Sequence, residues 1–248
     1  MRATNERDVQ RVHGAAKKLQ EILEMLCSEV RVGMTGRELD KRAQTLIHKA
    51  GGKPAFIGYG NPPFPAALCV SRNDCVVHGI PDAVPFVAGD IIGLDIGMIY
   101  DGIFTDMART VTLDPVSRRE QELVRATYDA LPKFLSVIRP GSKTGDLGYA
   151  MQTYFEGLGF GVVRDLAGHG VGDALHEPPE IPNFGTPGKG AIFSKGMVIA
   201  VEPMVTLGDW RVRIDTDGWS VKTRDGSKTA HTEDMVLVTD TGAEILTR

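Results

Sequence analysis

Apolar residues recur with the periodicity of a helix in the first fifth of the chain. Between residues 9 and 26 they stand three and four positions apart, and Asn5, a residue type that caps helices, precedes them. Thr35 and Glu38 form a capping-box pattern, and the apolar periodicity behind it continues to Ala50. The pattern predicts two consecutive amphipathic helices.

Further along, helical segments alternate with strand-like runs. A third helical region is expected over about 117–138, where Pro132 predicts a kink or break because proline cannot donate an interior hydrogen bond. A fourth is expected over about 144–156, with Gly157 as its stop. The strand-like runs are residues 66–70, 90–99, 103–112, 197–206 and 233–238. This mixture predicts an α/β fold in which helices flank a largely antiparallel sheet.

Two aspartates interrupt the apolar run around residue 100. Asp101 and Gly102 between two β-rich runs predict a hairpin with a two-residue turn, and that register brings Asp106 to the same face as Asp95. A buried carboxylate without a partner costs several kcal/mol, so such groups are usually paired or bound to a cation. Either one aspartate caps a turn or pairs with Arg109, or a divalent cation lies between the two.

The same pattern returns in the second half of the chain. Glu202 lies inside the apolar stretch GMVIAVEPMVTLG, and Glu233 stands at the head of another strand-like run. Together with the two aspartates, these residues would place four negative charges in a core unless something neutralises them. Two divalent cations would do so.

Composition narrows the classes of protein that fit. The chain has 248 residues, 42% of them hydrophobic, and a net charge of −4 without a dense basic block, which argues against nucleic acid as the main partner. No apolar run approaches the length of a membrane-spanning helix, and the first ten residues have no signal-peptide core. Three cysteines without a C-x-x-C pair favour the cytoplasm and the absence of a disulfide framework.

Histidines supply further ligand chemistry. His13 and His48 fall on predicted helices and are expected at the surface, and His231 is expected to face solvent near the start of a strand. The remaining three lie beside glycines or turns, where backbone approaches a site closely: His78, His169 and His176. Carboxylates with one or two imidazoles suit Mn, Fe(II), Co or Zn more than Ca or Mg.

Five stretches, in this order and spacing, resemble the type I methionine aminopeptidases of the pita-bread fold: NDCVVHGIPD, DIGMIYDGIFTDMARTVTL, GHGVGDALHEPPEIPNFG, GMVIAVEPMV and DGWSVKTRDGSKTAHTED. The resemblance spans nearly the whole chain. It implies a single catalytic domain over residues 1–248, in which two related halves form a pseudo-two-fold antiparallel sheet inside and helices outside.

The resemblance also implies the roles of individual residues. The ligands of two divalent metal ions would be Asp95, Asp106, His169, Glu202 and Glu233, with Asp106 and Glu233 bridging the ions. Glu202 would also act as general base, and His78 and His176 would hold the substrate and stabilise the tetrahedral intermediate. The pocket for the methionine side chain would be formed by Tyr59, Phe64, Cys69 and Trp219.

The function implied by the resemblance is removal of the N-terminal methionine from nascent proteins when the second residue is small. The partners would be N-termini of peptides or nascent chains, and the enzyme would act in the cytoplasm as a monomer, with a ribosome contact left open. No direct binding to nucleic acid or a membrane is expected.

Some features depart from that family. The segment GYGNPPFP, residues 58–65, is longer than expected and puts the assignments of Tyr59 and Phe64 in doubt, and Leu175 stands where an aromatic residue is common. TEDMVLVT is more similar to the related Xaa-Pro peptidases, which leaves an Xaa-Pro aminopeptidase or prolidase-like enzyme as the alternative. A non-catalytic binding module on the same fold is a weaker alternative, because all five candidate ligands are present.

Overall fold

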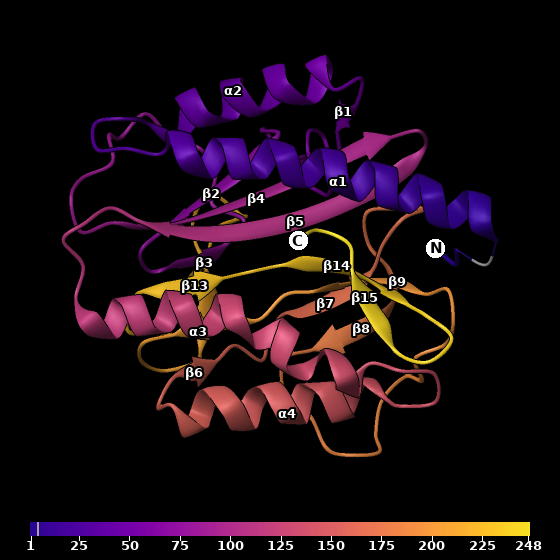
Figure 1. The fold of residues 1–248 in the computed structure, drawn as a ribbon. Helices are drawn as coiled ribbons and strands as arrows, with labels where there is room; N and C mark the ends of the chain where they lie inside the picture. Colours follow the sequence, from indigo (N-terminus) through magenta and orange to yellow (C-terminus); the bar gives the residue numbers. More distant parts are fainter. Residues whose placement is uncertain (4) are drawn as a thin grey trace.

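The computed structural model describes residues 1–3 and 5–248. Its helices are α1 (Glu6–Glu29), α2 (Gly36–Lys49), α3 (Arg118–Phe134) and α4 (Thr144–Gly157), with a short 3-10 helix at Leu135–Val137. Helices α1 and α2 lie on one side of the strands, and α3 and α4 lie on the opposite side (Figure 1). Within the described residues, no helix is both long and apolar enough to cross a membrane.

The strands form four sheets, and every pairing between described strands is antiparallel. The first sheet contains β1 (Lys53–Pro54), β2 (Leu68–Arg72), β4 (Ile91–Tyr100) and β5 (Ile103–Thr112). The second contains β6 (Gly161–Val162), β10 (Met204–Thr206) and β13 (Thr229–His231), and the third contains β3 (Cys75–Val77), β11 (Val212–Ile214) and β12 (Val221–Thr223). The fourth contains β7 (Ala167–Gly170), β8 (Glu177–Pro182), β9 (Val198–Val201), β14 (Asp234–Val238) and β15 (Ala243–Ile245). The predicted combination of antiparallel sheet and flanking helices is confirmed.

The hairpin between β4 and β5 has the predicted turn and register. Asp101 and Gly102 form the two-residue loop with φ angles of 50° and 74°, which glycine adopts easily and aspartate tolerates. Tyr100 therefore pairs with Ile103, and the ladder continues without a bulge to the far end of both strands. The even-numbered loop is what brings the two aspartates to one face.

The helix boundaries follow the capping residues. Asn5 accepts from the backbone N–H of Asp8 at 2.9 Å, and Thr35 forms a complete capping box with Glu38. Pro132 does not break α3 at its own position. The helix continues for two residues, to Phe134, and then tightens into the 3-10 turn. The predicted break is therefore displaced by one half-turn.

The predicted strand over 197–206 is wrong as a single element. It is divided into β9 and β10, because Pro203 has no N–H to donate to a ladder. Glu202 lies between the two strands, so the in-and-out alternation of neither strand determines the direction of its side chain.

Each half of the chain has its own apolar core. Leu23 and Leu94 belong to a buried cluster between α1, α2 and the first sheet. Phe155 and Val236 belong to a second cluster between α3, α4 and the strands of the fourth sheet. Both cores consist of apolar residues, and neither includes the polar residues where the halves meet.

Candidate metal and active site

Asp95 and Asp106 are the contribution of the hairpin to the site. Asp95 lies opposite Ala108 and Asp106 lies opposite Gly97, so the two buried carboxylates stand on one face, one diagonal step apart. Gly97 is required here, because a Cβ atom at this position would overlap the ring of Phe56. The hairpin therefore presents two acidic side chains beside an aromatic one.

Glu202 and Glu233 come from the second half of the chain. Glu233 precedes β14 and pairs with Ala108 of β5, donating to its carbonyl oxygen at 3.0 Å and accepting from its N–H at 3.3 Å. This pairing joins the two halves next to Asp106. The four carboxylates, all buried, are thereby brought into one cluster.

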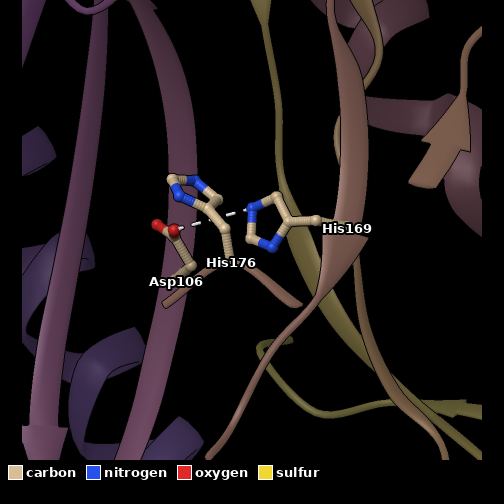
Figure 2. A group of neighbouring side chains, drawn as sticks. All are labelled: Asp106, His169 and His176. Carbon is tan, nitrogen blue, oxygen red and sulfur yellow. Dashed lines mark ion pairs between the residues drawn. The ribbon is translucent and has the colours of Figure 1, made fainter. Parts of the chain in front are cut away.

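His169 on β7 faces this cluster. Its Nε2 atom lies 3.5 Å from a carboxylate oxygen of Glu202 and 3.9 Å from oxygens of Asp106 and Glu233. Figure 2 shows the ring directed at Asp106, with His176 beside it. The Nδ1–H of His169 donates to the carbonyl oxygen of Gly170 at 2.9 Å, so Nε2 carries the lone pair that a metal ion requires.

The donor atoms form groups of the size that binds a cation. Within each group, one atom from every residue lies within 4.8 Å of the others, and two groups share Glu233: His169, Glu202 and Glu233, and Asp95, Asp106 and Glu233. A third group combines Asp106, His169 and His176. One oxygen of Asp95 and one of Glu233 are buried without a hydrogen-bond partner among the described residues. Orphaned buried carboxylate oxygens in a mixed oxygen and nitrogen donor set fit divalent cations.

The electrostatics of the cluster agree with this fit. Burial raises the pKa of Asp95 to about 6 and that of Glu202 to about 8. Burial, followed by the neighbouring carboxylates, raises the pKa of Asp106 and of Glu233 well above their usual range. Carboxylates in such surroundings retain protons unless a positive charge replaces them.

His78 and His176 line the same cavity. Burial lowers the pKa of His78 to about 4 and also lowers the pKa of His176, so both rings are neutral near pH 7. His78 packs edge-on against Trp219 with ring centroids 6.0 Å apart, and His176 packs against His169 at 4.3 Å. The structure thus brings both predicted catalytic histidines to the carboxylate cluster.

An apolar chamber opens beside the cluster within a cavity of about 720 Å³. Its walls, here called the chamber residues, are Phe56, Phe64, Cys69, Leu175 and Trp219. Phe64, Cys69 and Trp219 were expected from the sequence, whereas Phe56 was missed because nothing in its local pattern separates it from an ordinary core residue. Tyr59 also lines the cavity, but it is 39% exposed and its hydroxyl lies 2.5 Å from Nδ1 of His176.

The predicted solvent-facing position of His231 is wrong. His231 is only 4% exposed, because β13 pairs with β10 opposite Met204 and its backbone N–H donates to the Thr110 hydroxyl at 3.0 Å. Its Nε2 atom lies 3.5 Å from Glu202 Oε2 and has no hydrogen-bond partner in the part of the chain that the structure describes. The sequence did contain a signal for this position. His231 and Glu233 are two positions apart, and side chains with this spacing in an extended segment point to the same face. His13 and His48 lie at the surface, as expected.

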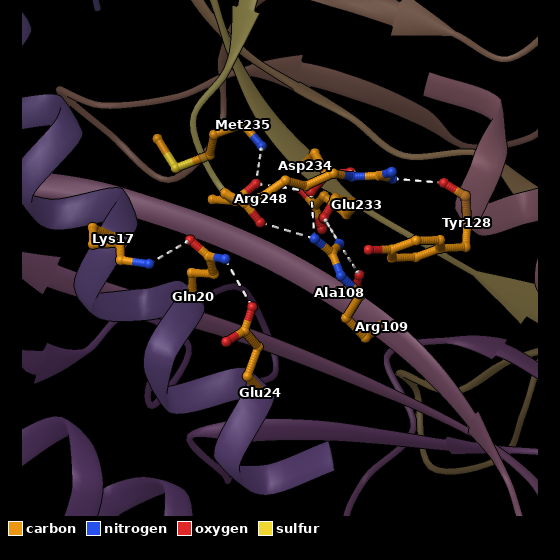
Figure 3. A network of polar contacts seen from close by, with 11 residues as sticks. Lys17, Gln20, Glu24, Ala108, Arg109, Tyr128, Glu233, Asp234, Met235 and Arg248 are labelled. Atoms are coloured by element: carbon orange, nitrogen blue, oxygen red, sulfur yellow. Dashed lines mark hydrogen bonds and ion pairs between the residues drawn. The ribbon is translucent and has the colours of Figure 1, made fainter. Parts of the chain in front are cut away.

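Arg109 does not pair with either hairpin carboxylate. It donates instead to Asp234 at 2.5 Å and to the carbonyl oxygens of Glu233 and Thr247 at 2.8 and 2.9 Å (Figure 3). Asp234 also accepts from Arg248 at 2.8 Å. Asp234, the second acidic residue of TEDMVLVT, therefore pairs with two arginines. The alternative in which Arg109 neutralises Asp95 or Asp106 is thereby excluded.

The buried cluster of histidine and carboxylate donors fits a metal-binding protein, and the family match identifies the class as a metallopeptidase. Residues 10–240 match metallopeptidase family M24, and the chain belongs to this family, which implies a divalent-metal site. Among its members the chain belongs with the methionine aminopeptidases. It is 42% identical to the methionine aminopeptidase of Clostridium perfringens over 98% of this chain and 97% of that protein. The crystal structure of methionine aminopeptidase from Thermotoga maritima superposes with a TM-score of 0.95 at 41% identity, covering 100% of this chain and 99% of that one.

More distant structures share the fold alone. The prolidase from Pyrococcus furiosus has a TM-score of 0.78 at 22% identity and covers 98% of this chain but 64% of its own. The predicted pita-bread fold and the predicted family are both confirmed.

Proposed function

We propose that this chain is a methionine aminopeptidase that removes the N-terminal methionine from peptides and nascent proteins whose second residue is small. The observation that carries the proposal is the apolar chamber directly beside the carboxylate and histidine cluster in one cavity. Similarity to methionine aminopeptidases over the whole chain supports it against the Xaa-Pro alternative. The binding-module alternative is disfavoured because all five candidate ligands converge.

We propose that two divalent ions occupy the cluster. One would be held by His169, Glu202 and Glu233 and the other by Asp95, Asp106 and Glu233, with Glu233 common to both groups. Asp106 also approaches His169 and is proposed as a second bridge. The donor set suits Mn, Fe(II), Co or Zn. Ions bound here would lower the pKa of a water molecule and would polarise a peptide carbonyl.

The protein side chains would move the protons of the reaction. Glu202 is the proposed general base: burial raises the pKa of its carboxyl to about 8, and a bound cation would offset this rise and keep the group ionised, so that it can accept a proton near neutral pH. His78 and His176, both neutral, would orient the peptide and donate to the oxygen that develops negative charge.

The chamber residues would bind the methionine side chain. Aromatic faces make favourable contacts with a thioether, and an unbranched side chain fits a narrow apolar space. Burial raises the pKa of the Cys69 thiol well above its usual value, so this wall remains uncharged. Charged and β-branched first residues should therefore be excluded.

Three peptides test this specificity. Met-Ala-Ser should be cleaved, Met-Leu-Ser should be cleaved far more slowly because its second side chain crowds the carbonyl, and Leu-Pro-Ser should be untouched. The measurement is kcat/KM for release of the first residue. An Xaa-Pro peptidase requires proline at the second position, so faster cleavage of Leu-Pro-Ser than of Met-Ala-Ser would overturn the methionine assignment.

His78→Ala separates the proposed ligands from the proposed substrate-binding residues. The variant should lose turnover by about 10²-fold, as is typical when an oxyanion donor is removed. Calorimetric titration with Mn(II) should still give the wild-type number of sites, since His78 is in none of the three donor groups. Loss of one metal equivalent would show that His78 is a ligand.

We also propose that residues 1–248 act as one catalytic domain and as a cytoplasmic monomer. The candidate ligands come from both halves of a single chain, and the three cysteines are free thiols, which supports a reducing compartment. A ribosome contact stays open, and no residue is assigned to it.

A further inference from the structure

Tyr59 makes a contact that a pocket wall does not need. Its hydroxyl lies 2.5 Å from Nδ1 of His176, and the two rings are 5.0 Å apart at an interplanar angle of 64°. The residues are 117 positions apart in the sequence, one in each half of the chain. The hydroxyl therefore reaches across the cavity to a proposed catalytic residue.

The backbone holds Tyr59 in place for this contact. Its N–H donates to the carbonyl oxygen of Phe56 at 3.0 Å, and its carbonyl oxygen accepts from the N–H of Phe64 at 2.8 Å. Gly60, with a φ of 76°, lies so close to Trp219 that a Cβ atom would overlap the indole. The segment is thus closed on itself and packed on a chamber residue, which limits the directions available to the tyrosine ring.

The direction of this hydrogen bond and the position of the proton on His176 determine each other. A neutral imidazole has one N–H, and the partner of one nitrogen fixes the state of the other. A phenol is protonated at neutral pH, burial raises the pKa of Tyr59 further, and its hydroxyl can either donate to Nδ1 or accept from it. When the hydroxyl donates, Nδ1 of His176 accepts and the proton resides on Nε2, where it can be donated to an oxygen in the cavity.

The neighbouring histidine has the opposite arrangement. Nδ1 of His169 donates to Gly170, which leaves its Nε2 with a lone pair for a cation. The two rings are 4.3 Å apart, and His169 is in both a two-carboxylate donor group and a group with His176 (Figure 2). One ring is prepared as a metal ligand, and a donating Tyr59 hydroxyl would prepare the other as a hydrogen-bond donor.

We infer that Tyr59 is a positioning residue, whose hydroxyl donates to Nδ1 of His176 and holds this ring as the Nε2–H tautomer. The inference rests on the proposed function in one respect, because that function identifies the acceptor of the Nε2–H group as the oxygen of the scissile carbonyl. It does not depend on the number or identity of the metal ions.

Tyr59→Phe tests the inference because it keeps the ring as a wall and removes only the hydroxyl. With Met-Ala-Ser, kcat should fall about 5- to 10-fold, the effect of one hydrogen bond, while KM changes less than about twofold. Tyr149→Phe is the matched control, since Tyr149 is exposed on α4, away from the residues that line the cavity. An unchanged kcat, or a raised KM with unchanged kcat, would show that Tyr59 is only a wall and would overturn the inference.

A spectroscopic measurement decides the tautomer without turnover. In the Zn(II)-loaded protein, ¹H–¹⁵N correlation of the imidazole nitrogens should show His176 protonated on Nε2, with the signal assigned by its loss in His176→Asn. Tyr59→Phe should shift this ring toward a mixture of tautomers, and Tyr149→Phe should not. A wild-type ring protonated on Nδ1 overturns the inference. Failure of the wild-type protein to cleave Met-Ala-Ser would refute the proposed function instead, and the spectrum would still decide the role of Tyr59.

Discussion

Glu202→Gln should lower kcat for Met-Ala-Ser by at least about 10²-fold, the smallest loss typical of a missing general base. The amide has nearly the shape of the carboxylate but cannot accept a proton, and it is a poorer metal ligand. The position is sensitive because Glu202 is buried, with one oxygen 3.5 Å from His169 Nε2 and the other 3.5 Å from His231 Nε2. The measurement is steady-state kinetics together with calorimetric Mn(II) binding, which should show one weakened site.

Glu21→Gln provides the control for this substitution. Glu21 is exposed on α1, on the outer face of the molecule, so the same chemical change there should leave turnover unaltered. A Glu202→Gln variant with more than about a tenth of wild-type kcat would exclude Glu202 as the base.

Removal of divalent metal should abolish turnover while preserving the fold. The two apolar cores contain no candidate ligand, so far-UV circular dichroism should be unchanged after chelation. The melting temperature should fall, because a ligand that binds the native state at 100 times its Kd contributes about 2.7 kcal/mol of stability. For a chain of this size, each kcal/mol corresponds to roughly 2–4 °C.

Restoring the metal is the decisive half of that experiment. Mn(II), Fe(II) or Co(II) added back to the chelated protein should restore both turnover and the melting temperature. Full activity in protein shown to be metal-free by elemental analysis would refute the assignment of the carboxylate cluster. Loss of the circular dichroism signal on chelation would instead show that the cores do not hold the halves without metal.

The sequence was most informative where local rules determine geometry. The turn at Asp101 and Gly102 fixes an even-numbered loop, and the two-residue period of strands then places Asp95 and Asp106 on one face. Capping at Asn5 and Thr35 likewise depends on residues only three positions apart. The convergence of these aspartates with Glu202 and Glu233 came from the family resemblance, since the pairing of Ala108 with Glu233 spans more than a hundred residues.

The features that were missed depend on contacts between distant segments. His231 is buried because β13 lies against β10 and Thr110, neither of which its neighbours in sequence reveal. Phe56 reaches the chamber only because Gly97, far along the chain, has no side chain. The hydrogen bond from Tyr59 to His176 joins two loops from different halves, so no local pattern could have indicated it.

The residues around the chamber are of two kinds, which differ in how freely they can be substituted. Some lie in strands opposite a candidate ligand, and others lie in loops. Gly97 faces Asp106 across the hairpin, and Cys69 on β2 faces Asp95 in the same sheet, so enlarging either would disturb a candidate ligand together with the wall. Phe64 and Leu175 lie outside the strands, and neither pairs with a ligand in a ladder. Laboratory evolution toward other first residues should therefore accumulate changes at these two loop positions, while the strand positions remain fixed.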